Sequence, residues 1–102
     1  MGVLVYNGEQ FAFDDRLLSH LKLVMVQKMR RDEGFLLSWS YSLEQGSGRS
    51  SIWIHGGANL HFRFDGSRPA TLNKEWMDRM IIATHTTGGL VLEAVPEEPR
   101  TE

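Results

Sequence analysis

The dipeptide Asn7-Gly8 determines how the N-terminal part of this chain can fold. Asn followed by Gly readily takes positive φ at both central positions of a type I′ turn, whose twist matches that of two antiparallel strands. Residues 3–6 and 10–13 are rich in apolar side chains and flank the dipeptide on both sides. The sequence therefore predicts a two-stranded hairpin whose pairing is fixed by a two-residue loop.

A helix is predicted directly after this hairpin, over residues 15–31. Asp14 and Asp15 can cap its N-terminus, and basic residues at its other end, before Gly34, complement the helix dipole. At about 100° per residue, one arc of the helix is apolar and is expected to pack on a sheet. The residues of this arc are Leu17, Leu18, Leu21, Val24, Met25 and Met29.

Two further apolar residues of this helix, Leu23 and Val26, lie outside the arc. Either a neighbouring element of the same chain covers them, or they form a contact between two copies. Both arrangements stay open from the sequence. We expect a homodimer for the protein as a whole, and Leu23 and Val26 are the candidate contact residues if no other element covers them.

Three segments in the middle of the chain alternate between apolar and polar residues, as strands with one buried face do. The apolar positions are Phe35, Leu37, Trp39 and Tyr41, then Ile52 and Ile54, then Leu60, Phe62 and Phe64. We expect them to form an antiparallel meander.

The register of the last two strands can be predicted from the same pattern. If Ile54 lies opposite Phe62, then Trp53 lies opposite Arg63 and His55 opposite His61. The loop would then be residues 57–59, with Asn59 in the left-handed conformation that a three-residue loop requires.

A second helix is predicted over residues 72–85, capped by Thr71 or Asn73 and ended by Gly88-Gly89. A last strand follows at 90–95, and residues 96–102 are polar and rich in Pro, so we expect an acidic, disordered tail. The predicted fold is a single α+β domain over residues 1–95, with element order ββαβββαβ and two helices packed on an antiparallel sheet.

Charge and composition exclude several function classes. The chain has 102 residues, no Cys and a formal charge of −2, all of which comes from the tail. A neutral body argues against binding duplex DNA by bulk charge, and the absence of Cys excludes disulfides, Cys-ligated zinc and thiol nucleophiles. No segment resembles a signal peptide or reaches the roughly 18 apolar residues of a membrane span, so we expect a cytoplasmic protein without membrane contact.

No complete catalytic or metal motif is present. Residues 46–51 are rich in Gly and Ser but lie between two strands, so we expect a hairpin loop in which Arg49 could contact a partner. His55 and His61 have no third ligand nearby, and no Ser stands in a nucleophile elbow. His20 is expected to lie at the surface or at a helix cap. We therefore expect neither metal, cofactor nor enzymatic activity.

Six segments that together span nearly the whole chain carry a resemblance to known sequences: residues 13–21, 28–31, 35–39, 48–53, 72–76 and 88–90. With them the chain resembles a family of short, uncharacterised actinobacterial proteins whose members are often labelled ATP-dependent DNA ligase. The resemblance implies a shared fold and a DNA-related context. Ligase activity itself is not expected, because the Lys-x-Asp-Gly motif that takes up adenylate is Arg63-Phe64-Asp65-Gly66 here, and arginine stays protonated.

These observations predict a small, non-enzymatic binding module. We expect it to bind an unidentified protein partner through the polar face of its sheet. The candidate binding residues on that face are Ser38, Ser40, Trp53, His55, His61 and Arg63. The alternative is a nucleic-acid accessory protein, because an aromatic ring beside a guanidinium suits single strands without a large net charge.

Overall fold

The Asn7-Gly8 hairpin forms as predicted in the computed structural model, which describes residues 1–41 and 48–98. Strands β1 (Gly2–Tyr6) and β2 (Glu9–Phe13) pair in antiparallel fashion, with Tyr6 opposite Glu9. Asn7 has φ 49° and Gly8 has φ 88°, as the type I′ turn requires.

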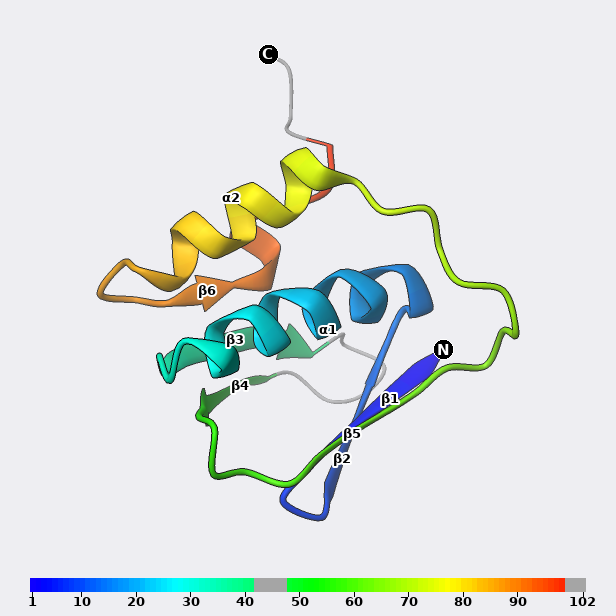
Figure 1. Ribbon diagram of the computed structural model, residues 1–102, viewed down its shortest axis with the longest axis horizontal. Helices are drawn as coiled ribbons and strands as arrows, with labels where there is room; N and C mark the ends of the chain where they lie inside the picture. The colour runs from blue at the N-terminus through cyan, green and yellow to red at the C-terminus, as the bar shows by residue number, and fades with distance from the viewer. Residues whose placement is uncertain (42–47, 99–102) are drawn as a thin grey trace.

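The order of the remaining elements confirms the α+β prediction. Within residues 1–41 and 48–98, two helices and four more strands follow the hairpin in the order αβββαβ (Figure 1). They are α1 (Asp15–Arg30), β3 (Phe35–Tyr41), β4 (Gly48–Ile54), β5 (Leu60–Arg63), α2 (Lys74–Thr84) and β6 (Leu90–Val91). The last strand is shorter than predicted, because a 3-10 turn, η2 (Leu92–Ala94), replaces its second half.

The strands of the described residues form two sheets of three strands each. The first sheet has the order β2-β1-β5 and the second has the order β4-β3-β6, in which β6 runs parallel to β3. The predicted meander is therefore correct for β3 and β4 and wrong for β5, which pairs with β1. Alternation sets which face a strand buries, but it does not identify the neighbour that the strand pairs with.

The predicted register between β4 and β5 is accordingly wrong. Ile54 lies opposite Phe35, and Trp53 lies opposite Leu36. Positive φ among the described non-glycine residues occurs at Asn7 and Asp32, so Asn59 does not take the predicted left-handed conformation. Asn59 instead joins the first sheet, because its backbone N–H donates to Asn7 Oδ1 at 3.0 Å and its carbonyl accepts from Asn7 N at 2.9 Å.

Helix α1 packs its predicted apolar arc into the core. Asp14 caps it by accepting from the backbone N–H groups of Arg16 and Leu17 at 3.1 and 3.2 Å. Leu17 and Met29 at the margins of the arc are half-buried, and its other members, Leu18, Leu21, Val24 and Met25, are buried. Figure 1 shows α1 lying across both sheets, with α2 beside it.

Helix α2 is shorter than predicted at both ends. Asn73, one of the two predicted caps, accepts from Trp76 N at 3.1 Å, and the helix ends at Thr84 with His85 as its C-cap. Gly89 has φ 71° in the turn that leads into β6, where a Cβ would meet the Leu36 carbonyl oxygen. The glycine pair therefore makes the turn after the helix rather than ending the helix itself.

The expectation that the chain does not pack beyond residue 95 is wrong for Pro96 and Glu97. Their carbonyl oxygens accept hydrogen bonds from the Arg79 guanidinium, both at 2.7 Å, and the Glu97 carboxylate accepts from Arg16 Nε at 2.7 Å. Residues 99–102 of the predicted tail lie outside the described residues. Neither described helix has the length and apolarity that a membrane span requires.

Candidate functional site

The six predicted binding residues do not share one surface. Ser38, Ser40 and Trp53 lie on the outer face of the second sheet, where Trp53 is 56% exposed. Arg49 lies on this face as well, in β4 and opposite Ser40, rather than in the predicted loop. This face therefore keeps half of the predicted binding residues together.

The other three predicted residues lie elsewhere. His61 and Arg63 are in β5, opposite Val5 and Val3, so they belong to the outer face of the first sheet. His55 follows β4, and its ring meets the Tyr6 ring edge-on with the centroids 6.4 Å apart. The predicted pairs of His55 with His61 and of Trp53 with Arg63 do not form. Within the described residues, no group of three or more His, Asp or Glu side chains is placed to hold a metal ion.

His20 also differs from the prediction, because it is fully buried rather than at the surface. Its Nδ1 donates to the Arg16 carbonyl oxygen at 2.7 Å and its Nε2 accepts from Asn73 N at 2.8 Å. Its ring also packs against that of Trp76, with the centroids 4.6 Å apart. This histidine therefore links α1 to the start of α2, and no signal in the sequence distinguishes it from a surface residue.

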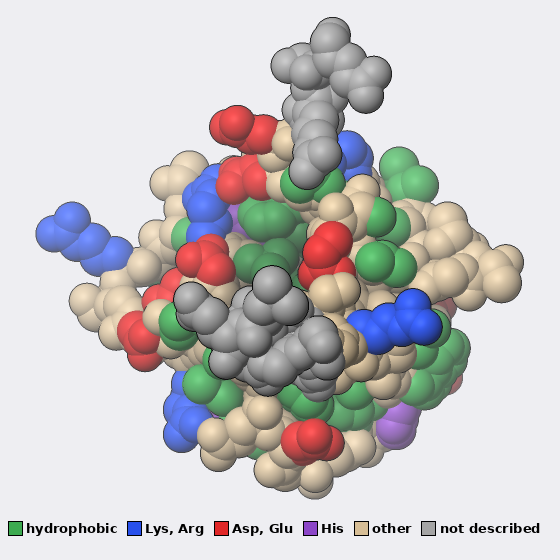
Figure 2. Space-filling view, turned by 180° about the vertical axis from the view of Figure 1, so that it is seen from behind, with side chains coloured by type: hydrophobic (Ala, Val, Ile, Leu, Met, Phe, Trp, Pro, Cys, Tyr) green, Lys and Arg blue, Asp and Glu red, His purple; other side chains and the backbone are tan. Residues whose placement is uncertain are grey.

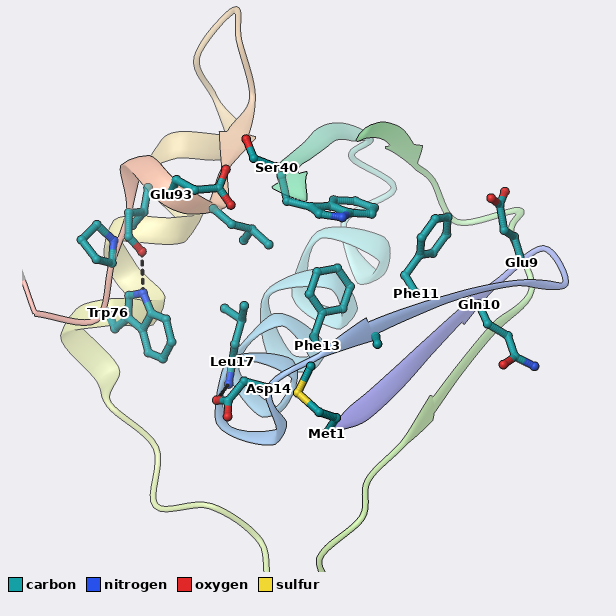
Figure 3. A pocket seen from close by; sticks show the side chains of 15 residues that line it. Met1, Glu9, Gln10, Phe11, Phe13, Asp14, Leu17, Ser40, Trp76 and Glu93 are labelled. Atoms are coloured by element: carbon teal, nitrogen blue, oxygen red, sulfur yellow. Dashed lines mark hydrogen bonds between the residues drawn. The ribbon is translucent and has the colours of Figure 1, made fainter. Parts of the chain in front are cut away.

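A hollow lies along β2, and we call it the β2 groove (Figure 3). Its volume is about 760 Å³. All five residues of β2 line it, and the opposite side is formed by the end of β3, by α2 and by the η2 segment. Seen from behind, hydrophobic side chains on this side of the molecule lie between acidic ones (Figure 2).

Aromatic rings form the wall of the β2 groove. Trp39 meets both Phe11 and Phe13 edge-on, each at a centroid distance of 5.1 Å. Trp76 is held in place on the other side because its indole N–H donates to the Val95 carbonyl oxygen at 2.8 Å, the dashed line of Figure 3. Phe13, Trp39 and Trp76 are mostly buried and Phe11 is half-buried. Their shared packing makes a firm, preformed apolar surface.

The charged side chains among the described residues that line the β2 groove are acidic, and the N-terminal ammonium of Met1, which also lines it, is paired with Asp65. The acidic residues are Glu9, Asp14 and Glu93, and neither Lys nor Arg is among the described lining residues. In Figure 3, Glu9 lies at one end of the groove, and Asp14 and Glu93 lie toward the other. The groove therefore combines an apolar wall with a negative rim, which favours a ligand that is apolar and cationic.

A second hollow, of about 500 Å³, runs between α1 and α2. Leu23 and Val26 line it together with Met77 and Ile81 of α2. Both predicted contact residues are half-buried, so α2 covers them in part and leaves the remainder open. The structure thus shows partial cover by a neighbouring element, and the contact between two copies stays a prediction.

Comparison with known proteins identifies one family. The family model described as Domain of unknown function (DUF7882) matches residues 1–97. None of the curated proteins and none of the solved structures that were compared matches the chain.

Proposed function

The chain belongs to this family of unknown function, and we propose from the geometry that it is a protein-interaction module whose binding site is the β2 groove. The observation that carries the proposal is the preformed aromatic wall of Phe11, Phe13 and Trp39 beside a strand edge. Aromatic side chains supply much of the affinity of protein interfaces, because they bury large apolar areas and lose little conformational entropy.

The groove also has the form of a binding site in other respects. Its volume lies within the range of pockets that hold ligands, and its charged groups lie at the rim rather than in the wall. A half-buried Phe11 at the surface of an otherwise buried cluster gives an entering side chain an apolar partner.

This function is tested by selecting displayed peptides on the immobilised protein and re-testing the enriched peptides on two variants. We expect Phe11→Ala to abolish binding and Trp53→Ala, on the outer face of the second sheet, to leave it unchanged. Circular dichroism is used to check that both variants are folded. Failure to enrich any peptide, or enriched peptides that bind Phe11→Ala as tightly as the wild type, would contradict the proposal.

A nucleic-acid role is the second candidate, favoured by the outer face of the second sheet. Trp53 and Arg49 lie on the same face of β4, beside the hydroxyls of Ser38 and Ser51, which are hydrogen-bonded at 2.7 Å. Stacking on Trp53 with a guanidinium on the backbone would hold a single strand. Anisotropy of a labelled oligonucleotide tests this: Trp53→Ala is expected to weaken binding, whereas Phe11→Ala is not, and an identical response of both variants would exclude this face.

Association of two copies is proposed for the hollow between the helices. Leu23 and Val26 keep part of their surface open there, and Met77 and Ile81 extend the apolar strip. Light scattering at tens of micromolar is expected to give the mass of a dimer, and Val26→Glu to give a folded monomer. Val91→Glu, on the outer face of the second sheet, is the control. A monomeric wild type would exclude this contact.

A further inference from the structure

We propose that the occupant of the β2 groove is an extended, basic segment of a partner protein that adds to the first sheet as a fourth strand beside β2. This inference rests on the proposed function and specifies how the partner is bound and what its sequence requires. It follows from three features of the groove: the backbone of β2, the alternation of its side chains and the charge of the rim.

The outer edge of β2 presents the backbone N–H and C=O groups of every second residue for hydrogen bonding. β2 is the terminal strand of the first sheet, and no described strand pairs with its outer side. Tyr6 and Glu9 flank the two-residue turn, so they form a hydrogen-bonded pair. Along the two strands from that point, non-hydrogen-bonded and hydrogen-bonded pairs alternate. Gln10 and Ala12 therefore point their N–H and C=O groups away from β1. A strand laid along this edge would bond to both residues.

The side chains of such a strand would alternate between the groove and the solvent. The Phe11 and Phe13 side chains face the groove, whereas Gln10 and Ala12 border the groove along the strand but have exposed side chains on the opposite face of the sheet. A residue placed opposite Phe11 or Phe13 has its side chain on the same face as those rings. Apolar side chains at every second position of the partner would thus contact the aromatic wall, and the positions between them are free to be polar.

The rim determines the charge of the partner. Three carboxylates line the groove. The one cation among its described lining residues is the N-terminal ammonium of Met1, which is already paired with Asp65. Lys or Arg next to the apolar positions would therefore be attracted and acidic residues repelled. The same carboxylates argue against a second copy of this chain as the occupant. Pairing β2 with β2 would bring two acidic rims together, which is unfavourable.

The first test uses fluorescein-labelled peptides with the sequence Lys-Val-Thr-Val-Thr-Val-Lys, measured by anisotropy. Two further versions carry N-methyl groups on alternate residues, either on the Val set or on the Thr set. Because only one set of N–H groups can face β2, we expect one methylated version to lose binding by about tenfold or more and the other to keep it. Equal binding by both methylated versions would overturn strand addition.

The second test concerns charge. Replacing both Lys of the peptide by Glu is expected to weaken binding by about tenfold or more, and Glu93→Lys in the protein to restore part of it. Glu98→Lys, at an exposed residue outside the groove, is the matched control. Unchanged affinity on charge reversal would overturn the requirement for a basic segment.

The outcomes separate this inference from the proposed function. Selected peptides that require Phe11 but tolerate both methylated sets would leave the groove as the binding site and exclude strand addition. If the wild type has the mass of a dimer and the Ala12→Pro variant has the mass of a monomer, the occupant of the β2 edge is a second copy, and the inference is overturned. Absence of any Phe11-dependent binding would overturn both proposals.

Discussion

At the scale of single residues, His20 has the largest predicted effect on stability. It is fully buried, and its ring nitrogens bond the Arg16 carbonyl and the Asn73 N–H. His20→Phe keeps an aromatic ring against Trp76 but leaves the Asn73 N–H without an acceptor. We expect the free energy of unfolding to fall by about 1–3 kcal/mol, measured by urea denaturation. His85→Ala, at the exposed end of α2, is the control and should change it by less than about 0.5 kcal/mol.

A second residue-scale prediction concerns the pH dependence of stability. The Arg16 guanidinium, hydrogen-bonded to Glu97, lowers the pKa of that carboxyl from its ordinary value of 4.5 to about 2. The folded state therefore binds the proton more weakly than the unfolded state, so the interaction stabilises the fold above pH 4.5 and is lost as the pH falls toward about 2.

Thermal unfolding of Glu97→Gln tests this dependence. At neutral pH the variant should melt below the wild type, and the difference should shrink as the pH falls through the window between the two pKa values. Glu98→Gln, at the neighbouring exposed residue, should follow the wild type throughout. A difference between wild type and Glu97→Gln that is constant across acidic pH would contradict the assignment.

At the scale of elements, the first hairpin depends on the backbone of one glycine. Gly8 has φ 88° and nothing lies within 4 Å of a Cβ added there, so only the backbone conformation opposes a side chain. Gly8→Ala should therefore lower the free energy of unfolding by about 1 kcal/mol. Gly88→Ala is a matched control, since its site is equally open and its φ is not positive. Equal stability of the two variants would show that the turn tolerates a side chain.

Elements with a local signal were predicted from the sequence. The Asn7-Gly8 turn, the Asp14 cap and the apolar arc of α1 are set by neighbours in the chain, and each is present in the structure. The partner of β5 is not a local property, because Phe62 fits equally well against Ile54 or against Leu4, which is its actual partner. The β2 groove could not be predicted for the same reason: it forms where Phe11 meets Trp39, far along the chain.

At the scale of the whole molecule, Tyr6 connects the two sheets. Its hydroxyl donates to the Trp53 carbonyl oxygen in β4, and burial raises the pKa of Tyr6, so the group remains a donor at neutral and moderately basic pH. Tyr6→Phe removes this bond while keeping the ring, and we expect a loss of about 1 kcal/mol in denaturant unfolding. A variant as stable as the wild type would indicate that the sheets are held by apolar packing alone.

The pairing of β5 with β1 also affects how the protein comes to be folded. The chain leaves the first sheet after β2, builds β3 and β4 of the second, returns with β5, and leaves again for β6. Neither half of the chain contains a complete sheet. A lone two-stranded hairpin has only marginal stability in water. During synthesis the β1–β2 hairpin is therefore expected to become stable only after β5 has been made and pairs with β1. Folding is then expected as one late, all-or-none event, with slow amide exchange in both sheets governed by a single opening free energy.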